Sequence, residues 1–328
     1  MLRVGVVGAT DSARVHRARY DELEGVSVAG VAPAPGGPAP PGGDAHAYED
    51  VEELLADAVD AIDVCAPAGA TRPAVESAAA AGLPVACRAP LADDIADATA
   101  VADAVEDAGV PFVGGGPTRF GPEYAAVEEG VGEITGAPGV VRVEREYPVR
   151  EGAADWRADA GETGSLLLDL AGLDVGFLRW AIGDIERVFA RESAAGDSEH
   201  ALTLLRFGNG AMAHLDTLRA PLPEAPYRVT VDLAGREGNV EFDSGDAAAM
   251  RFHDAGGSEP DPYQELPLTD GHGRDAYHYR LAHFRDVAAG DTASRASVAD
   301  ALRTTRATLA AVESARRGAP VAPAEVGR

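Results

Sequence analysis

The chain contains no lysine, so all 28 basic residues are arginine, and they face 54 aspartates and glutamates in 328 residues. The formal net charge of −26 repels nucleic acid phosphates and anionic membranes, which excludes both as partners. Concentrated salt screens such self-repulsion. We therefore expect a halophilic source. A GC-rich genome that replaced lysine by arginine is the alternative explanation, and the two causes can act together.

Other absences narrow the class of protein. No apolar run approaches the roughly 20 residues that cross a bilayer, and the first seven residues resemble a strand rather than a signal peptide. These features predict a cytoplasmic protein. The two cysteines, Cys65 and Cys87, lie in apolar stretches and are expected to be reduced core residues. No cluster has the spacing of metal ligands, so no metal is expected. Hydrolase and kinase motifs are absent too.

The first 120 residues alternate between apolar stretches of strand length and Ala-rich helical segments. The expected strands cover residues 2–8, 26–32, 61–67, 83–89 and 110–116. Strands without polar alternation, separated by helices, indicate a parallel sheet covered on both faces. Residues 1–120 are therefore predicted to form an α/β, doubly wound Rossmann domain that resembles a dinucleotide-binding domain.

Residues 121–328 show another pattern, and we expect them to form a substrate and oligomerisation domain. Six partly alternating strands are predicted within residues 139–244, most of them joined by short turns. Long helices are predicted at residues 164–183, 276–290 and 297–318. The second domain is therefore predicted to be α/β, with a large, mainly antiparallel open sheet.

The turn after the first strand, GVVGATDSA, resembles a dinucleotide-binding GxGxxG turn. Gly8 keeps the first glycine, Ala13 is an accepted small residue, and Thr10 replaces the second glycine, where the pyrophosphate approaches. Either the hydroxyls of Thr10 and Ser12 donate to a phosphate, or Asp11 caps the helix in a domain that no longer binds a dinucleotide. The sequence leaves both interpretations open.

The end of the second strand lacks the group that selects between NAD and NADP. An acidic residue would bind the ribose hydroxyls there, and an arginine would bind a 2′-phosphate. The chain has Ala32, Pro33 and Ala34 at this point, followed by a Pro/Gly-rich loop through residue 43. Asp44 could fold back from that loop. The cofactor, NAD or NADP, is thus left open.

The order and spacing of several motifs resemble the glucose-fructose oxidoreductase, inositol dehydrogenase and rhizopine-catabolism (Gfo/Idh/MocA) family. These motifs are GVVGATDSARVH, YEDVEELLAD, VDAIDVCAP, GLPVACRAPLA, GGGPTRFGPEY, GSLLLDLAGLDVGFLRW, GREGNVEFD and HFRDVAAGD. The resemblance covers nearly the whole chain. It implies NAD(P)-dependent oxidation of sugars, polyols or related hydroxy compounds, and a homodimer or homotetramer formed through the open sheet.

The chain also departs from the family's motifs at several positions. In CRAPLA, Arg88 and Ala89 replace the glutamate and the lysine of the family's CEKPLA. In DLAGLDVG, Asp169 keeps the aspartate of the family's helix motif, but Leu173 replaces its histidine. Asp174 is expected to face away from the histidine position. Asp169 is the candidate general base or substrate ligand, and Arg88 is a second catalytic candidate, able to fix a substrate oxygen but too basic to accept a proton. The other interpretation of Asp169 is a helix carboxylate paired with an arginine.

Further candidates follow from the same motifs. The resemblance places cofactor contacts at Gly8, Thr10, Asp11, Ser12, Ala66, Pro67 and Pro90, and substrate contacts at Arg119, Tyr147, Trp156 and Arg157. For Arg119 and Trp156, packing between domains is the alternative. His278 could act as an acid or base if it faces the cleft, whereas His16 is expected to be structural.

Two functions remain open from the sequence. One is an NAD(P)-dependent oxidoreductase with an altered proton relay, in which the cofactor carries the hydride chemistry. The other is a family-derived ligand-binding, sensor or partner-subunit protein without turnover. In either case the expected ligand is a small molecule.

Overall fold

The computed structural model describes residues 1–37, 45–149, 165–221, 225, 227–245, 250–254 and 275–327. The first sheet has five parallel strands in the order β2-β1-β3-β4-β5. Their bounds are β1 Leu2–Val7, β2 Val26–Ala32, β3 Ala61–Val64, β4 Val85–Cys87 and β5 Phe112–Val113. Each predicted strand of the first domain is present, and the predicted doubly wound sheet is confirmed.

Four of the described helices pack around the first sheet. They are α1 Asp11–Asp21, α2 Val51–Ala56, α3 Thr71–Ala80 and α4 Ile95–Ala108. Three of them, α1, α2 and α4, begin at a polar side-chain cap. Asp50 caps α2 and Asp94 caps α4 through backbone N–H groups, and α4 ends at the left-handed Gly109. Their alanines let the helices pack closely on the strands. The strand ends that precede these helices therefore meet at one edge of the sheet, where cofactors bind in such folds.

The second sheet has seven strands in the order β12-β11-β10-β6-β9-β8-β7. Their bounds are β6 Pro138–Pro148, β7 Ile185–Ala195, β8 Ser198–Phe207, β9 Met212–Ala220, β10 Arg228–Gly235, β11 Gly238–Asp243 and β12 Met250–Asp254. Only the β6–β9 pair is parallel, so the mainly antiparallel sheet is confirmed. The edge strand β12 was not among the predicted strands, because it spans five residues of which only two are apolar.

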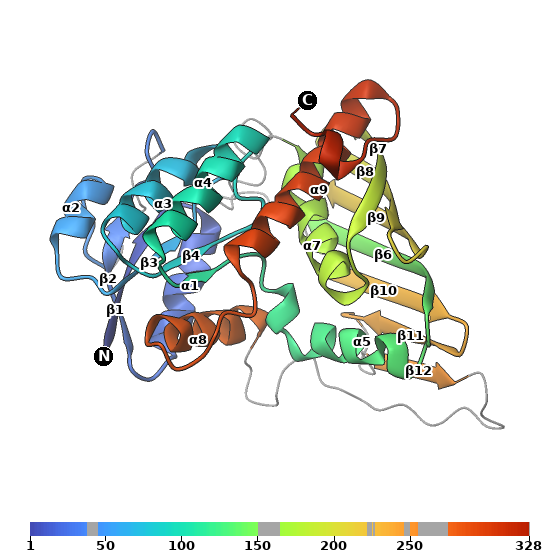
Figure 1. Ribbon diagram of the computed structural model, residues 1–328, viewed down its shortest axis with the longest axis horizontal. Helices are drawn as coiled ribbons and strands as arrows, with labels where there is room; N and C mark the ends of the chain where they lie inside the picture. Colours follow the sequence, from blue (N-terminus) through green and yellow to red (C-terminus); the bar gives the residue numbers. More distant parts are fainter. Residues whose placement is uncertain are drawn as a thin grey trace.

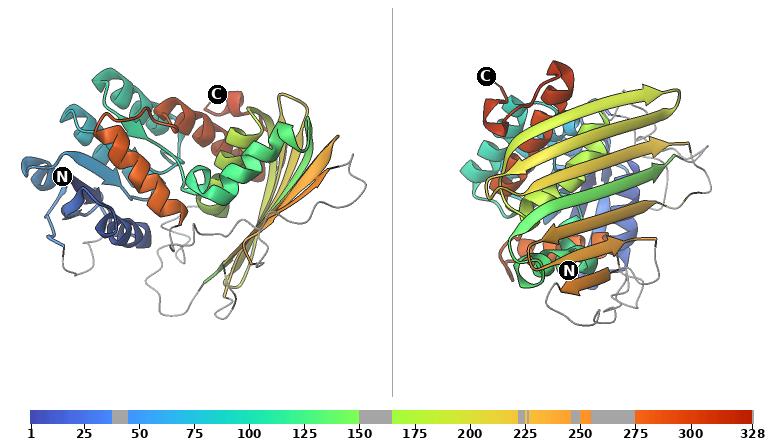
Figure 2. Two further views of the ribbon diagram at one scale, coloured as in Figure 1. Left: turned by 90° about the horizontal axis from the view of Figure 1, so that it is seen from below. Right: turned by 90° about the vertical axis from the view of Figure 1, so that its right-hand side faces the viewer.

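The described helices cover one face of this sheet, and none of them lies on the other face (Figure 2). The covering elements are α5 Pro122–Glu133, α7 Gly172–Ala181 and α9 Val298–Arg317. The predicted helix 164–183 begins with a π-helical turn, η4, at Leu167–Ala171. The buried core lies between these helices and the alternate, inward-facing residues of the strands.

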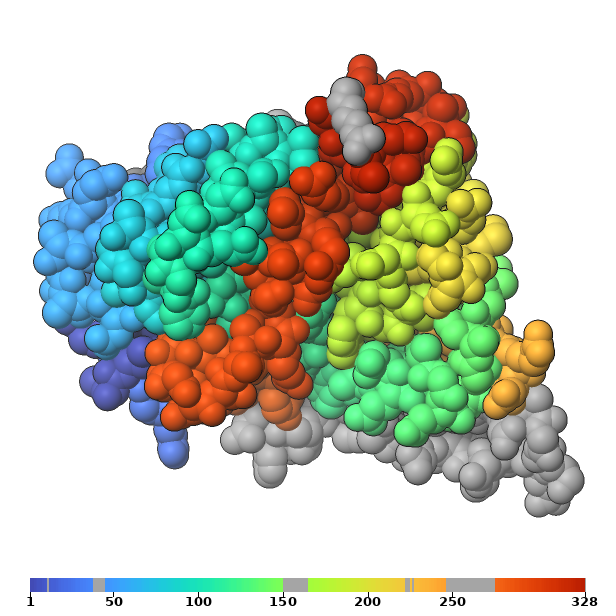
Figure 3. Space-filling view, in the orientation of Figure 1, coloured from blue at the N-terminus to red at the C-terminus, as the bar shows by residue number. Residues whose placement is uncertain are grey.

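The last two helices join the two sheets. Helix α8, Ala276–Ala288, packs against α1 and β5 of the first domain, and α9 runs between the domains and contacts both α4 and α7 (Figures 1 and 3). The guanidinium of Arg280 in α8 donates to the carbonyls of Cys87, the last residue of β4, and Gly115, two residues after β5. Because α8 and α9 follow the second sheet in the chain but pack on the first domain, the predicted domain boundary at residue 120 stays a prediction. Among the described helices, none is both long and apolar enough to cross a membrane.

Candidate functional site

The turn after β1 has the geometry of a tight dinucleotide loop. Gly8 has φ +126°, and a Cβ atom there would lie 2.6 Å from the carbonyl oxygen of Cys65. The Thr10 hydroxyl donates to that same carbonyl at 2.8 Å and accepts from the N–H of Ala13, so its side chain caps α1. Thr10, rather than the expected Asp11, is therefore the N-cap residue of α1. The N–H of Ala13 is thereby engaged, so an anion would bind the backbone N–H groups that precede it in the first turn of α1.

Two further residues of this turn, Asp11 and Ser12, were predicted to contact the cofactor. Ser12 is buried. Asp11 is the first residue of α1 rather than its cap, and because its side chain lies outside the described part of the structure, its expected phosphate contact stays a prediction.

A buried hydrogen-bonded cluster lies beneath the turn. The Nδ1 atom of His16 is 2.7 Å from an Asp63 oxygen and 3.2 Å from the Cys65 sulfur. Tyr20 donates to the same Asp63 oxygen. Burial alone would raise the pKa of the Asp63 carboxyl, but His16, Arg280 and Tyr20 together hold that pKa below its usual range. The sequence gives no hint of this cluster, because its members come from helix α1 and strand β3.

This cluster is also the place where the described residues bring potential metal ligands together, within 4.8 Å. The contacts favour hydrogen bonding over metal binding. The Nδ1 atom of His16 lies within hydrogen-bond distance of both Asp63 and Cys65, which leaves no space for an ion between the three groups. Burial raises the pKa of the Cys65 thiol well above its usual value, so the thiol remains protonated. The positive charge of nearby Arg280 also opposes a cation. The expected absence of a metal stays a prediction.

The two catalytic candidates form an ion pair. Arg88 follows β4, Asp169 lies in the π-helical turn before α7, and their side chains meet at 2.9 Å. The Asp169 side chain is 2% exposed and that of Arg88 16%. Of the two interpretations of Asp169, the structure therefore favours the carboxylate paired with an arginine. The positive charge of Arg88 stabilises the ionised carboxylate and makes it a weaker general base.

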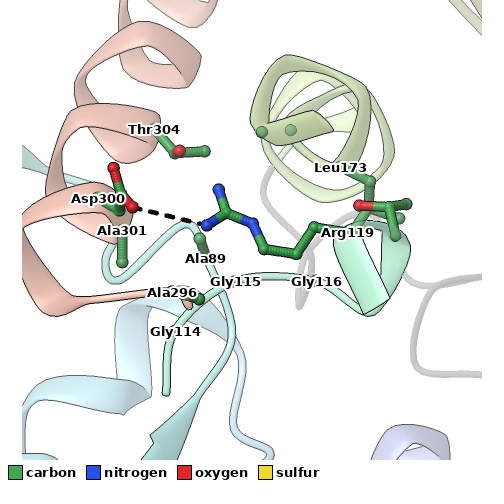
Figure 4. Close-up of a pocket in the computed structure, with 13 residues that line it drawn as sticks. Ala89, Gly114, Gly115, Gly116, Arg119, Leu173, Ala296, Asp300, Ala301 and Thr304 are labelled. Atoms are coloured by element: carbon green, nitrogen blue, oxygen red, sulfur yellow. Dashed lines mark ion pairs between the residues drawn. The ribbon is translucent and has the colours of Figure 1, made fainter. Parts of the chain in front are cut away.

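The positions of the family's lysine and histidine meet in a cavity of about 20 Å³, room for roughly one water molecule. Ala89 and Leu173 line it, and the side chain of Arg119 crosses it toward Asp300 (Figure 4). Arg119 lies 3.5 Å from the Asp300 carboxylate and donates to the Arg295 carbonyl at 2.7 Å. The guanidinium also lies 5.6 Å from the centre of the Trp180 ring. These contacts favour the packing interpretation of Arg119 over the substrate contact.

A second cavity of about 400 Å³ opens beside the first, and Thr118 and Leu173 line both. Its wall combines tyrosines and apolar side chains from both domains with an arginine and two carboxylates. The lining includes Tyr124, Tyr147, Tyr227, Tyr277, Leu170, Phe242, Arg145, Glu123 and Asp275. Its volume suits a small organic ligand. Of the predicted substrate contacts, Tyr147 lies here.

Arg145 is held in the cavity wall by a carboxylate on the helix opposite. Both oxygens of Asp174 accept from the guanidinium, the Nε contact being 2.8 Å, and both side chains are 1% exposed. The charge of Asp174 raises the pKa of Arg145 despite the opposing effect of burial. Asp174 thus faces the sheet and orients a cavity residue. The alternation Val141, Val143, Arg145 carried this signal, because it places the arginine on the inward face of β6.

The two cavity carboxylates differ in their partners. Asp275 caps α8 by accepting from the His278 N–H, and its oxygens are 2.8 and 3.2 Å from Arg19 nitrogens. Glu123, in the first turn of α5, is 8% exposed, and its Oε2 atom has no hydrogen-bond partner in the described structure. Burial raises the pKa of the Glu123 carboxyl, and the charge of Asp275 adds to the increase.

The remaining candidates separate into three groups. Ala66 is buried, Pro67 precedes the short helix η1 at Ala68–Ala70, and Pro90 packs beside α7. Their cofactor contacts stay predictions. The imidazole of His278 lies 3.7 Å from Glu22 of α1, and His278 is not among the cavity-lining residues. Trp156 and Arg157 lie outside the described residues.

Comparisons with known proteins address this fold directly. A family model for an oxidoreductase family with an NAD-binding Rossmann fold matches residues 2–115, and the Gfo/Idh/MocA C-terminal domain model matches residues 126–241. The chain belongs to the Gfo/Idh/MocA family. The resemblance predicted from the motifs is thus confirmed.

Individual members of the Gfo/Idh/MocA family match most of this chain. D-xylose 1-dehydrogenase (NADP(+)) 2 of Haloferax volcanii is 30% identical over 63% of this chain, which spans 65% of that relative. Myo-inositol 2-dehydrogenase of Thermotoga maritima is 28% identical over 75% of both chains. The crystal structure of GenD2 from gentamicin A biosynthesis, in complex with NAD, is 25% identical, has a TM-score of 0.79 and covers 98% of this chain and 96% of its own.

Proposed function

We propose that the protein is an NAD(P)-dependent oxidoreductase that acts on a hydroxyl group of a sugar, polyol or related compound. The observation that carries the proposal is the connection between the cavity and the turn after β1. The ring of Tyr277, in the cavity wall, lies 5.5 Å from His16, and His16 contacts Cys65, whose carbonyl accepts from Thr10. A substrate in the cavity would therefore lie close to a cofactor on the first sheet.

The residues of the first domain fit a dinucleotide at the pyrophosphate. The close approach at Gly8 and the N-terminus of α1 form a cradle of backbone N–H groups. A bound nicotinamide would supply the acceptor or donor of a hydride. Ala32, Pro33 and Ala34 offer neither a carboxylate nor a guanidinium to the ribose, so NAD and NADP both remain candidates. The NAD in the GenD2 structure and the NADP(+) in the name of the Haloferax relative agree with this.

A ligand-binding protein without turnover is the second candidate. It is favoured by the apolar Ala89 and Leu173 at the positions where the family carries a lysine and a histidine, and by Arg119 across the space between them. Such a protein would bind a cofactor or small ligand and transfer no hydride. Binding and turnover measured on the same preparation distinguish the two candidates.

We further propose a homo-oligomer that forms through the open face of the second sheet. Large apolar side chains are exposed on this sheet, at Val140, Leu202, Leu204 and Met212. Exposed apolar groups gathered in this way are typical of protein interfaces. The net charge of −26 supports a halophilic protein, and the assays below therefore use concentrated KCl.

Titration with NADH and NADPH tests cofactor binding. We expect nicotinamide fluorescence to change with one of them, and a concentration about 100 times its dissociation constant to stabilise the fold by about 2.7 kcal/mol. Inorganic pyrophosphate at the same concentration is the control for general anion effects. If neither nucleotide changes the fluorescence or the melting temperature, the protein is not a conventional member of this enzyme class.

A further inference from the structure

We propose that Glu123 is the proton-transfer residue of the 400 Å³ cavity and replaces the lysine and histidine that this chain lacks. The inference rests on the proposed oxidoreductase function and extends it to a residue that no motif marks. Its basis is the placement of a nine-tenths buried carboxyl, with an oxygen that has no partner in the described structure, in the wall of the cavity that would hold the substrate.

The other charged groups of the cavity wall, Asp275 and Arg145, are already engaged. Asp275 caps α8 and pairs with Arg19, and these contacts hold the pKa of its carboxyl below the usual range despite its burial. Arg145 pairs with Asp174 and, as an arginine, does not release its proton. Burial raises the pKa of the Tyr124 hydroxyl to about 12, so this hydroxyl is protonated at neutral pH and cannot take up the substrate's proton. Glu123 is the group left to accept a proton.

The environment of Glu123 suits this role. A Cβ atom on Gly121 would lie 2.6 Å from its Oε1 atom, so the glycine at the start of α5 makes room for the carboxyl to fold back over the helix end. Burial is the largest effect that disfavours the ionised form, and the like charge of Asp275 on α8 adds to it, whereas a hydrogen bond from the residue's own backbone N–H opposes both. The pKa of the carboxyl thereby moves toward neutrality, where a general base works best.

The step balances in protons and electrons. In the oxidative direction the hydroxyl-bearing carbon would lose its hydrogen as a hydride to a bound oxidised nicotinamide, as the O–H bond breaks and a carbonyl forms. The Glu123 carboxyl accepts the proton and later releases it to solvent. In the reductive direction protonated Glu123 donates to the new alkoxide, and the hydride would come from a bound reduced nicotinamide. Asp169 plays no part in this transfer, because its carboxylate is held by Arg88.

The Glu123→Gln variant tests the proposal, with Glu129→Gln on the exposed side of the same helix as the matched control. We expect Glu123→Gln to lower kcat about 100-fold or more while NADH or NADPH affinity stays within threefold of wild type. The low-pH limb of the wild-type kcat/KM profile is expected to vanish from the residual activity. Glu123→Asp should recover part of the rate, and Glu129→Gln should match wild type.

A second readout does not depend on turnover. Infrared difference spectra of the wild-type protein across a pH titration should contain a protonated-carboxyl band that persists above the usual carboxyl range, and Glu123→Gln should lack it. The proposal is overturned if Glu123→Gln keeps its rate and pH profile, or if no such band is assigned to Glu123. A wild-type protein that binds a nucleotide but never turns over contradicts the oxidoreductase function instead, and the infrared band alone then decides whether Glu123 is a titrating cavity carboxyl.

Discussion

Replacing Gly8 by alanine is expected to remove dinucleotide binding and to destabilise the first domain severely. The new Cβ would lie 2.6 Å from the Cys65 carbonyl oxygen, which belongs to the backbone and cannot rotate away. The residue would also keep a φ of +126°, which side chains rarely adopt. We expect the free energy of unfolding to fall by roughly 2–5 kcal/mol. Chemical denaturation of both proteins, with NADH titration of the fraction that folds, measures the two effects.

Gly25→Ala is the matched control for this variant. Gly25 also has a positive φ, of +78°, but no neighbouring atom lies within 4 Å of the Cβ that would be added. We therefore expect the free energy of unfolding to fall by about 1–2 kcal/mol, the cost of placing a side chain on a left-handed backbone, with nucleotide binding unchanged. Equal losses in the two variants would show that the close approach of the turn to β3 is unimportant.

Breaking the buried pair between Arg145 and Asp174 is expected to have the second large effect. Asp174→Ala leaves a guanidinium that is 1% exposed without its counter-charge, at a cost of roughly 3–5 kcal/mol. The freed arginine also lies in the cavity wall, so we expect KM for a bound substrate to rise together with the loss of stability. Urea denaturation and steady-state kinetics provide the two measurements.

Glu186→Ala gives the comparison for that pair. Glu186 lies 3.1 Å from Arg206 in the same sheet, but both side chains are more than half exposed. A pair of this kind contributes about 0–1 kcal/mol. If Asp174→Ala unfolds at the same urea concentration as Glu186→Ala, then burial of the Arg145–Asp174 pair has no energetic consequence, and the account of the cavity wall fails.

The sequence was sufficient for the fold because its signals are local. Continuous apolar strands such as residues 4–7, separated by Ala-rich helices, led to the parallel sheet, and alternation as in residues 139–149 led to the second sheet. The strand at residues 250–254 and the helix at 122–133 were missed. The strand is short, and the helix contains Gly132 with φ +93°, which interrupts the regular pattern.

The site was less predictable, because its parts meet only in three dimensions. Arg88 and Asp169 were each named from a motif, but their pairing depends on how β4 faces the turn before α7. Glu123 reads as an ordinary first-turn helix acid, and only its burial beside the cavity sets it apart. The His16 and Asp63 contact is similarly invisible, since 46 residues separate the two along the chain. The inward Arg145, by contrast, was visible in the alternation and could have been predicted.

The most direct test of the account is the absorbance of reduced nicotinamide. Wild-type protein in concentrated KCl would be mixed with NAD or NADP and a panel of pentoses, hexoses and inositols, alongside Glu123→Gln and Glu129→Gln. The account predicts that at least one substrate generates reduced cofactor with wild type and with Glu129→Gln, and about 100-fold more slowly with Glu123→Gln. Equal rates for wild type and Glu123→Gln, or no reduced cofactor with any substrate from a preparation that binds the nucleotide, would contradict it.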